Sequence, residues 1–358
     1  MPRVSVIIPS YNHAAYIAEA VNSVLSQSET DLELIVVDDG STDESLDVLA
    51  GFSDPRLRVF SQSNQGAHAA INRGLREARG KYLAILNSDD AYHPARLEKA
   101  LRVLEARPQI GLLGSYIEIV DAEGKTLGVK HGYKDCSPWL LEQPERSFRA
   151  TENLHAALLT ENYWATTSNF VFPRIWFERV GAFRPLRYAH DWDFALRMAQ
   201  VAQLELLPEP LVRYRVHPRN TIRENIAAMI FEICWCLAVH LPQNIADSRF
   251  FGGPSIEQQI DQLLHSIYTF GCDRVLAVMM LQLWAHPEQA EALLDVQDPL
   301  RARYLEFILQ HLAAENAPAQ PASPSAPSAT PIASLKSVWR KFWARVCRVV
   351  KRASGGGI

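Results

Sequence analysis

The chain has 358 residues, of which 48% are hydrophobic, an ordinary fraction for a folded soluble protein with one large domain or two smaller ones. The formal net charge is −4, but residues 334–358 contain seven Lys or Arg and no acid, so the rest of the chain is markedly acidic. The five cysteines are scattered and odd in number, which excludes a disulfide framework and fits a reducing cytosol. No charged leader precedes the first apolar run, so we expect no secretory signal.

In the first half of the chain, short apolar runs alternate with stretches of helical period. The runs are "VSVII", "LELIVV" and "YLAIL". One helical stripe consists of Ile17, Ala20, Val21, Val24 and Leu25. A second helix is predicted to begin with a capping box, Ser41 to Glu44, and a third to span about 66–78. This alternation predicts a mainly parallel sheet covered by helices.

Beyond about Asn220 the strand pattern ends, and helical segments continue to about Ala314. The most apolar segment, "IAAMIFEICWCLAVHL", contains Glu232 and is shorter than a bilayer span, so it predicts a buried helix. Cys234 and Cys236 fit apolar positions of that helix, and a metal-binding pair is the alternative. The next segment, "ENAPAQPASPSAPSATPIA", is too poor in large apolar groups to form a core and predicts a linker.

Polar clusters follow the three apolar runs, where the carboxyl ends of parallel strands meet and ligands bind. They are "PSYN", "DDGSTD" and "NSDD". The last two contain the pairs Asp38–Asp39 and Asp89–Asp90, and four converging carboxylates would repel one another unless a cation or hydrogen-bond donors offset their charge. A divalent cation favours such oxygens. For Asp90, a helix cap is the alternative.

Four segments in this order resemble the family 2 glycosyltransferases. They are "VSVIIPSYNHAAYIAEAVNSVLSQ", "LELIVVDDGSTDES", "NQGAHAAINRGLREARGKYLAILNSDD" and "AHDWDFALRM". The resemblance covers about residues 3–218 and implies the GT-A fold, an α/β fold with a Rossmann-like, mostly parallel sheet. The helical region and the basic tail lie outside it.

The resemblance implies a role for each residue around the nucleotide-sugar donor. Pro9, Tyr11 and Asp39 would hold the nucleobase, and Asp89 would contact the ribose. Asn72 is a further donor contact, although Ile71 stands before it where many relatives have Arg. The metal ligand would be Asp90, binding Mg2+ or Mn2+. His217 would approach the metal or the diphosphate, with a purely structural role as the alternative.

The resemblance also implies an acceptor site and a catalytic base. Asp191 would deprotonate the acceptor hydroxyl as it attacks the anomeric carbon, which inverts the configuration there. The alternative is that Asp191 and Asp193 cap the helix that follows. His190 replaces the Glu that usually precedes the base, and it would face the acceptor. Ser168 and Asn169 would contact acceptor hydroxyls, and burial with internal hydrogen bonds is their alternative.

We therefore expect a metal-dependent enzyme that moves one sugar to a glycan or lipid-linked glycan acceptor in cell-envelope polysaccharide synthesis. The family resemblance alone favours a UDP-linked donor. The Gln-x-x-Arg-Trp element of processive relatives is absent from the sequence. A nucleotidyltransferase acting on sugar phosphates and a catalytically silent nucleotide-binding scaffold at the membrane are the alternatives. No nucleic-acid partner is expected.

The basic tail predicts a helix with two faces over residues 334–352. One face is apolar and contains Leu335, Val338, Trp339, Phe342, Trp343, Val346, Val349 and Val350. The rest of the helix carries seven cations, Lys336, Arg340, Lys341, Arg345, Arg348, Lys351 and Arg352. The helix is therefore expected to lie on an anionic membrane surface, and docking on the acidic body is the alternative. The expected organisation is a catalytic domain at 1–218, a helical region at 219–315, a linker at 316–333 and this helix, in a cytoplasmic protein held at the inner face of the plasma membrane.

Overall fold

The computed structural model describes residues 1–133, 135–138, 153–218, 220, 224–244, 267 and 271–315. The chain divides into two compact units, residues 1–310 and 311–358. The sheet and the cavity described below lie in the first unit, and the described residues of the second, 311–315, end helix α12. The predicted linker (316–333) and the predicted basic helix (334–352) lie outside the described residues, and the predicted domain boundaries stay predictions.

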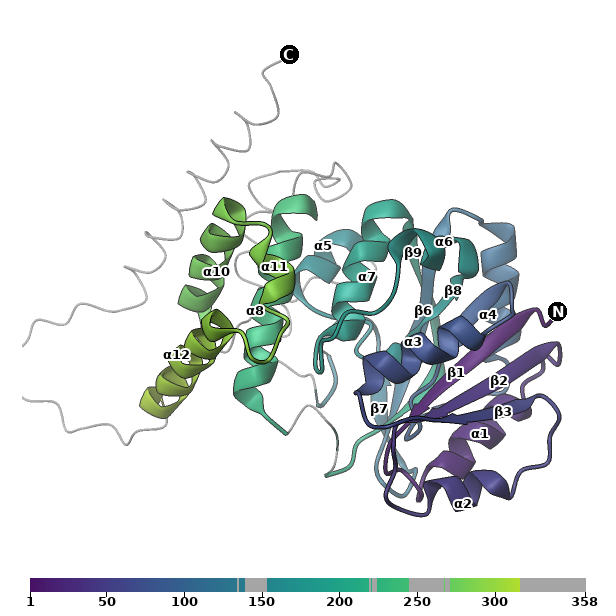
Figure 1. The fold of residues 1–358 in the computed structure, drawn as a ribbon. Coiled ribbons are helices and arrows are strands. Elements are labelled where there is room, and N and C mark those ends of the chain that lie inside the picture. Colours follow the sequence, from purple (N-terminus) through teal and green to yellow (C-terminus); the bar gives the residue numbers. More distant parts are fainter. Residues whose placement is uncertain are drawn as a thin grey trace, which may run out of the picture. The chain divides into compact units, whose positions relative to one another are not determined.

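The described strands form one mixed sheet (Figure 1). Its order is β3 (Leu57–Ser61), β2 (Leu32–Asp38), β1 (Val4–Ser10), β4 (Tyr82–Ile85), β8 (Val171–Pro173), β6 (Ile110–Val120), β9 (Gln203–Arg215) and β5 (Ala91–Tyr92), with β7 (Thr126–Lys130) paired to β6. The first four strands are parallel, as predicted. In this register Ser10 lies beside Asp38, so the carboxyl ends of β1 and β2 coincide.

Helices cover both faces of the parallel half. Those that follow its strands are α1 (Ile17–Leu25), α2 (Ser45–Ala50), α3 (Ala67–Glu77) and α4 (Arg96–Ala106). Later helices are α5 (Leu154–Thr160), η2 (Thr167–Asn169, a 3-10 turn), α6 (Arg174–Val180), α7 (His190–Val201), α8 (Ile226–Asn244), α10 (Asp273–Ala285), α11 (Gln289–Ala292) and α12 (Pro299–Glu315). The predicted fold class, an α/β sheet followed by helices, is confirmed.

Side-chain alternation along β1 explains the two layers. Val4, Val6 and Ile8 pack into one apolar cluster with α1, α2 and α4. Ile7 points to the opposite face, because successive side chains of a strand alternate. There α3 approaches so closely that a Cβ on Gly74 would lie 2.3 Å from Ile7 Cγ2, so glycine is required at this contact.

The predicted capping box at Ser41 is wrong. Helix α2 begins at Ser45, and its N-cap residue is Glu44. The Ser41 hydroxyl instead accepts a hydrogen bond from the Asn12 N–H, and the Ser41 N–H donates to Asp38. Asn12 belongs to the end of another strand, which local spacing could not reveal, whereas Asp38 lies only three residues before Ser41.

The described part of the helical region packs as a core rather than as separate helices. Helix α8 contacts α7, α5 and α10, and the Trp235 indole N–H donates to the Ala290 carbonyl of α11. Among the described residues α8 is the one helix long and apolar enough to cross a membrane, and 67% of its most apolar window is buried in the protein. The prediction of a buried helix is confirmed, and Cys234 and Cys236 occupy buried positions on it.

Asp193 on α7 joins the sheet-bound helices to α8. Its buried carboxylate accepts hydrogen bonds from Arg184 at 2.7 Å, from Arg197 at 2.9 Å and from His240 of α8 at 2.9 Å. Burial opposes ionisation, but the bond to His240 and the charges of the two arginines hold the pKa of Asp193 well below its usual range. Asp193 is thus part of an ion-pair network and not the helix cap that its sequence position allowed.

We expect Asp193→Asn to lower the free energy of unfolding by about 3 kcal/mol, because it removes the charged acceptor shared by the partly buried Arg184 and Arg197 and by the buried His240. The depressed pKa means that Asp193 contributes at neutral pH and that its contribution is lost only in strongly acidic solution. Denaturant unfolding at pH 7 measures the loss. Glu98→Gln, which breaks an exposed ion pair with Arg102, is the control and should cost less than about 1 kcal/mol. Equal stability of the two variants would contradict the assigned network.

Candidate active site

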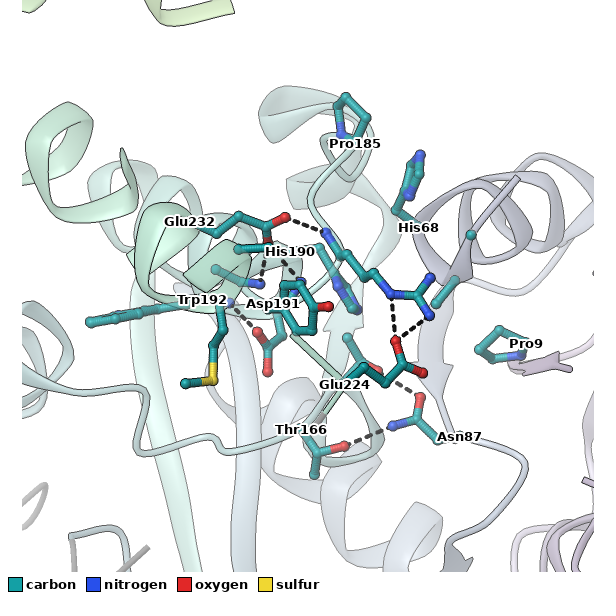
Figure 2. A pocket seen from close by; sticks show the side chains of 18 of the residues that line it. Pro9, His68, Asn87, Thr166, Pro185, His190, Asp191, Trp192, Glu224 and Glu232 are labelled. Carbon is teal, nitrogen blue, oxygen red and sulfur yellow. Dashed lines mark hydrogen bonds and ion pairs between the residues drawn. The ribbon is translucent and has the colours of Figure 1, made fainter. Parts of the chain in front are cut away.

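A cavity of about 1780 Å³ opens at the carboxyl ends of β1, β2 and β4 (Figure 2). This volume exceeds that of a typical small-molecule pocket and could admit a donor together with part of an acceptor. The predicted site residues that line it are Pro9, Tyr11, Asp39, Asp89, His190 and Asp191. The cavity continues past Asp191 to α8, where Met229, Glu232 and Ile233 form its wall.

Asp39 organises the loop that leads into α3. Its carboxylate accepts hydrogen bonds from the Gln62 side chain at 2.8 Å and from the backbone N–H groups of Gln65 and Gly66, the latter at 2.7 Å. Gly66 has φ of 91°, a conformation that favours glycine. Asp39 therefore holds the loop that lines this side of the cavity. A nucleobase N–H that bonded to Asp39 would share its carboxylate with these protein donors.

Asn72 does not line the cavity. Its side-chain amide donates to the Phe183 carbonyl at 2.8 Å, and its side-chain oxygen accepts from the Phe183 N–H at 2.9 Å. This pair of bonds ties α3 to the segment that leads into α7. The structure thus gives Asn72 a positioning contact with the Asp191 side of the cavity, where the resemblance implied a donor contact.

A cluster of three potential metal ligands lies at the end of β4. Donor atoms of His13, Asp89 and His217 all lie within 4.8 Å of one another. His217 Nε2 lies 3.0 Å from Asp89 Oδ2, and His13 Nδ1 lies 2.7 Å from the Ser88 hydroxyl. Burial would raise the pKa of Asp89, but the bond to His217 and the charges of His13 and His217 hold it below its usual value. Asp89 is thus the ionised carboxylate of the pair.

Asp90 has a different environment from Asp89. One of its oxygens accepts from the Ser168 hydroxyl at 2.6 Å and the other from the Arg215 N–H at 2.9 Å. Burial and the negative charge of Asp89 raise the pKa of Asp90 well above its usual value. Among the described residues that line the cavity, Asp89 is present and Asp90 is not. In this structure Asp89 faces the cavity, and metal ligation by Asp90 stays a prediction.

Ser168 and Asn169 are completely buried, which agrees with internal hydrogen bonding rather than acceptor contact. The Ser168 hydroxyl also accepts from the Asn87 N–H, and Asn169 bonds to the backbone N–H and C=O of Ser115. Their neighbour Thr166 lines the cavity instead, where its hydroxyl accepts from the Asn87 side chain (Figure 2).

Asp191 occupies the first turn of α7, facing the cavity. One carboxylate oxygen accepts from the Asn162 side-chain amide at 2.8 Å, and the other accepts from the Trp192 N–H at 2.7 Å. Both oxygens keep further lone pairs, so the carboxylate is held in place and can still accept a proton. His190 lies beside it, with its Nδ1 buried and without a hydrogen-bond partner among the described residues.

The cluster at the end of β4 has a donor set that suits a divalent transition metal. Two imidazoles and one carboxylate match Mn2+ better than Mg2+, which prefers oxygen ligands alone. The three donors are close enough for one ion to contact them all after small side-chain rotations.

Several residues of this site were not singled out by sequence analysis. His13 carried a usable signal, since it stands in the predicted polar loop after the first strand. Glu232 also carried one, as the acid within the most apolar segment. Asn162 carried none, because it reaches the cavity from a segment without a strand-end position.

The fold and the cavity define a sugar-nucleotide-dependent transferase of the GT-A type. Residues 5–181 match the family described as Glycosyl transferase family 2. An uncharacterised glycosyltransferase of Haemophilus influenzae is 32% identical over 225 residues, which are 62% of this chain and 67% of that protein. The chondroitin synthase of Escherichia coli is 31% identical over 225 residues, 62% of this chain and 30% of that protein.

The chain therefore belongs to glycosyltransferase family 2. It spans about two thirds of the length of the uncharacterised glycosyltransferases that it matches. Among solved structures, TarS 1–349 of S. aureus in complex with UDP-GlcNAc is similar in fold, with a TM-score of 0.50, 20% identity and coverage of 88% of this chain and 92% of that one.

We expect Asp89→Asn to weaken Mn2+ binding at least about 100-fold, because the ionised ligand is lost. Asp90→Asn should change it little, since Asp90 is buried and does not line the cavity. Titration calorimetry of the full chain with Mn2+ in the presence of UDP measures both. Asp47→Asn on the exposed face of α2 is the control. Loss of Mn2+ binding in Asp90→Asn with retention in Asp89→Asn would restore the ligand that the sequence predicted.

Proposed function

We propose that the protein is an inverting, metal-dependent glycosyltransferase that moves one sugar from a nucleotide-sugar donor to a hydroxyl of a glycan or lipid-linked glycan. The observation that carries the proposal is a single cavity lined both by Asp89 of the His13–Asp89–His217 cluster and by Asp191. The cluster that contains Asp89 would hold the cation and the donor diphosphate. Asp191 would act as the base.

In the proposed reaction the acceptor hydroxyl approaches the anomeric carbon from the side of Asp191. A new bond forms from the acceptor oxygen to the anomeric carbon, the bond from that carbon to the phosphate oxygen breaks, and the hydroxyl proton passes to the Asp191 carboxylate. The nucleoside diphosphate leaves on the opposite face, which inverts the configuration. The bonds from Asn162 and Trp192 hold the carboxylate during this step.

Donor binding is assigned to the strand-end side of the cavity. Pro9, Tyr11 and the Asp39 loop would surround the base. His13, Asp89 and His217 would hold Mn2+, which when bound offsets the negative charge of the leaving diphosphate. A mannosyltransferase of similar fold binds GDP-Man and Mn2+ and TarS binds UDP-GlcNAc, which makes these two donors the first to test, with the UDP-sugar placed first by family resemblance.

The acceptor is assigned to the side bounded by α7 and α8. His190 lines the cavity beside Asp191 and would contact an acceptor hydroxyl there. Relatives named chondroitin synthase support a growing polysaccharide as acceptor, and a cell-envelope glycan is the form that we propose.

We expect Asp191→Asn to retain donor binding and to lose transfer by at least about 100-fold, because the amide keeps the shape of the carboxylate but cannot take the proton. Release of nucleoside diphosphate from UDP-GlcNAc and GDP-Man with oligosaccharide acceptors measures transfer. Thermal stabilisation by UDP with Mn2+ measures donor binding. Asp47→Asn, an exposed acid in the first turn of α2, is the matched control. Undiminished transfer in Asp191→Asn would exclude the assigned base. In a separate assay, release of pyrophosphate from a nucleoside triphosphate with a sugar phosphate would indicate a nucleotidyltransferase.

Attachment to the cytoplasmic face of the membrane is a further part of the proposal, and it rests on the sequence of residues 334–352. Each basic residue near an anionic leaflet adds about 1 kcal/mol, so seven of them with an aromatic face should suffice for reversible binding. We expect deletion of 334–358 to abolish flotation with anionic vesicles and to leave turnover of a soluble acceptor unchanged. Replacement of Trp339 and Trp343 by Ala in the full chain should weaken flotation in the same direction. Flotation of the truncated protein at the level of the full chain would exclude this anchor.

A further inference from the structure

Three consecutive backbone N–H groups immediately before α7 donate to one carboxylate, that of Glu232 on α8. The Arg187 N–H donates to Oε1 at 3.0 Å, and the N–H groups of Tyr188 and Ala189 donate to Oε2 at 2.6 and 3.0 Å. Glu232 is 1% exposed, so nearly all of its hydration has been replaced by these bonds. Figure 2 shows it reaching from α8 toward the segment that carries His190 and Asp191.

This arrangement supplies α7 with a cap that its own sequence lacks. The first N–H groups of a helix have no partner within the helix, and an N-cap side chain usually accepts from some of them. The N-cap residue of α7 is Ala189, whose methyl group cannot accept a hydrogen bond. Glu232 accepts from this residue, and its negative charge lies at the positive end of the helix dipole.

The cap lies close to the proposed base. Asp191 follows Ala189 by two residues, so the orientation of this turn determines where the Asp191 carboxylate stands in the cavity. The Arg187 side chain is held in turn by Glu224, through Nε at 2.8 Å (Figure 2). Two turns after Glu232 on α8, His240 bonds to Asp193 of α7, so α8 holds α7 at two points.

Glu232 is itself supported from α12. The Arg301 guanidinium lies 4.0 Å from the Glu232 carboxylate and donates to the carbonyls of Leu293 and Leu294. Arg301 is buried as well, so a second helix of the region after residue 218 stabilises the charge on Glu232. Both Glu232 oxygens accept from backbone donors, which suits a role in holding the segment.

We propose that Glu232 is a positioning residue for the transfer reaction, through which α8 fixes the first turn of α7 and with it the Asp191 carboxylate. The inference rests on the proposed function of Asp191 as base. It gives the helical region a defined part in catalysis, because a transferase domain without α8 would leave Arg187, Tyr188 and Ala189 without their acceptor.

The test is Glu232→Gln in the full chain. Glutamine keeps the size of the side chain, but its NH₂ group cannot accept from the backbone donors, so the turn should loosen. We expect kcat for sugar transfer to fall about 10-fold or more, since small displacements of a catalytic group are costly. The affinity for UDP with Mn2+ should stay within about 2-fold, because that end of the cavity is untouched. Hydrogen exchange of the backbone amides in residues 187–193 should become faster.

Tyr304→Phe is the matched control. It removes a hydrogen bond to Gln282 inside the same helical region and leaves Glu232 and its partners in place. We expect it to change neither kcat nor amide exchange at 187–193. Unchanged exchange or unchanged kcat in Glu232→Gln would overturn the proposal, as would an equal loss of kcat in Tyr304→Phe or a parallel loss of UDP affinity. Absence of transfer in the unaltered protein would refute the proposed function instead, and the exchange measurement would still decide whether Glu232 holds this turn.

Discussion

The parallel pairing of β1 with β2 and β4 is the constraint on which the rest of the site depends. It brings the carboxyl ends of three strands to one edge of the sheet, and with them the loops that carry His13, Asp39 and Asp89. Because the strands are buried on both faces, helices must cover each side, and the loops can open only at this edge. The cavity therefore follows from the way in which the sheet is covered. Its polar lining follows from which residues terminate the strands.

Four carboxylates close together at this edge would repel one another, and in the structure they differ in burial and in hydrogen-bond partners. Asp38 and Asp90 are buried and bonded to neighbouring backbone or hydroxyl groups, whereas Asp39 and Asp89 reach the cavity. Within the second pair, burial and the charge of Asp89 raise the pKa of Asp90, whereas the bond to His217 and the nearby histidines lower the pKa of Asp89. Adjacent carboxyl groups thus differ in pKa because one faces two histidines and the other faces the protein interior.

The helices after residue 218 supply hydrogen-bond partners for α7 and for the segment before it. From α8, the Glu232 carboxylate accepts a hydrogen bond from the Ala189 N–H just before α7. His240 of α8 bonds to Asp193 in the first turn of α7. A charged residue in so apolar a helix would be unfavourable without partners, and here the partners are the backbone of the neighbouring segment. The apolar face of α8 and its single buried acid therefore serve one purpose, which is to hold α7 against the sheet.

Much of the fold could be predicted from the sequence, because it depends on local periodicity. Residues close to one another in the chain define the apolar runs at β1, β2 and β4, the stripe of α1 and the bounds of α3. The same is true of the four family motifs. What only the tertiary structure decided were partners distant in sequence: Ser168 for Asp90, His13 and His217 for Asp89, Asn162 for Asp191 and Glu232 for the turn before α7. Asp89, Asp90 and Asp191 are all aspartates, and their roles differ only through burial and partners. The sequence by itself therefore determined which residues end the strands, while the packing of distant segments decided which of them face the cavity, because hydrogen-bond partners and desolvation depend on neighbours in space.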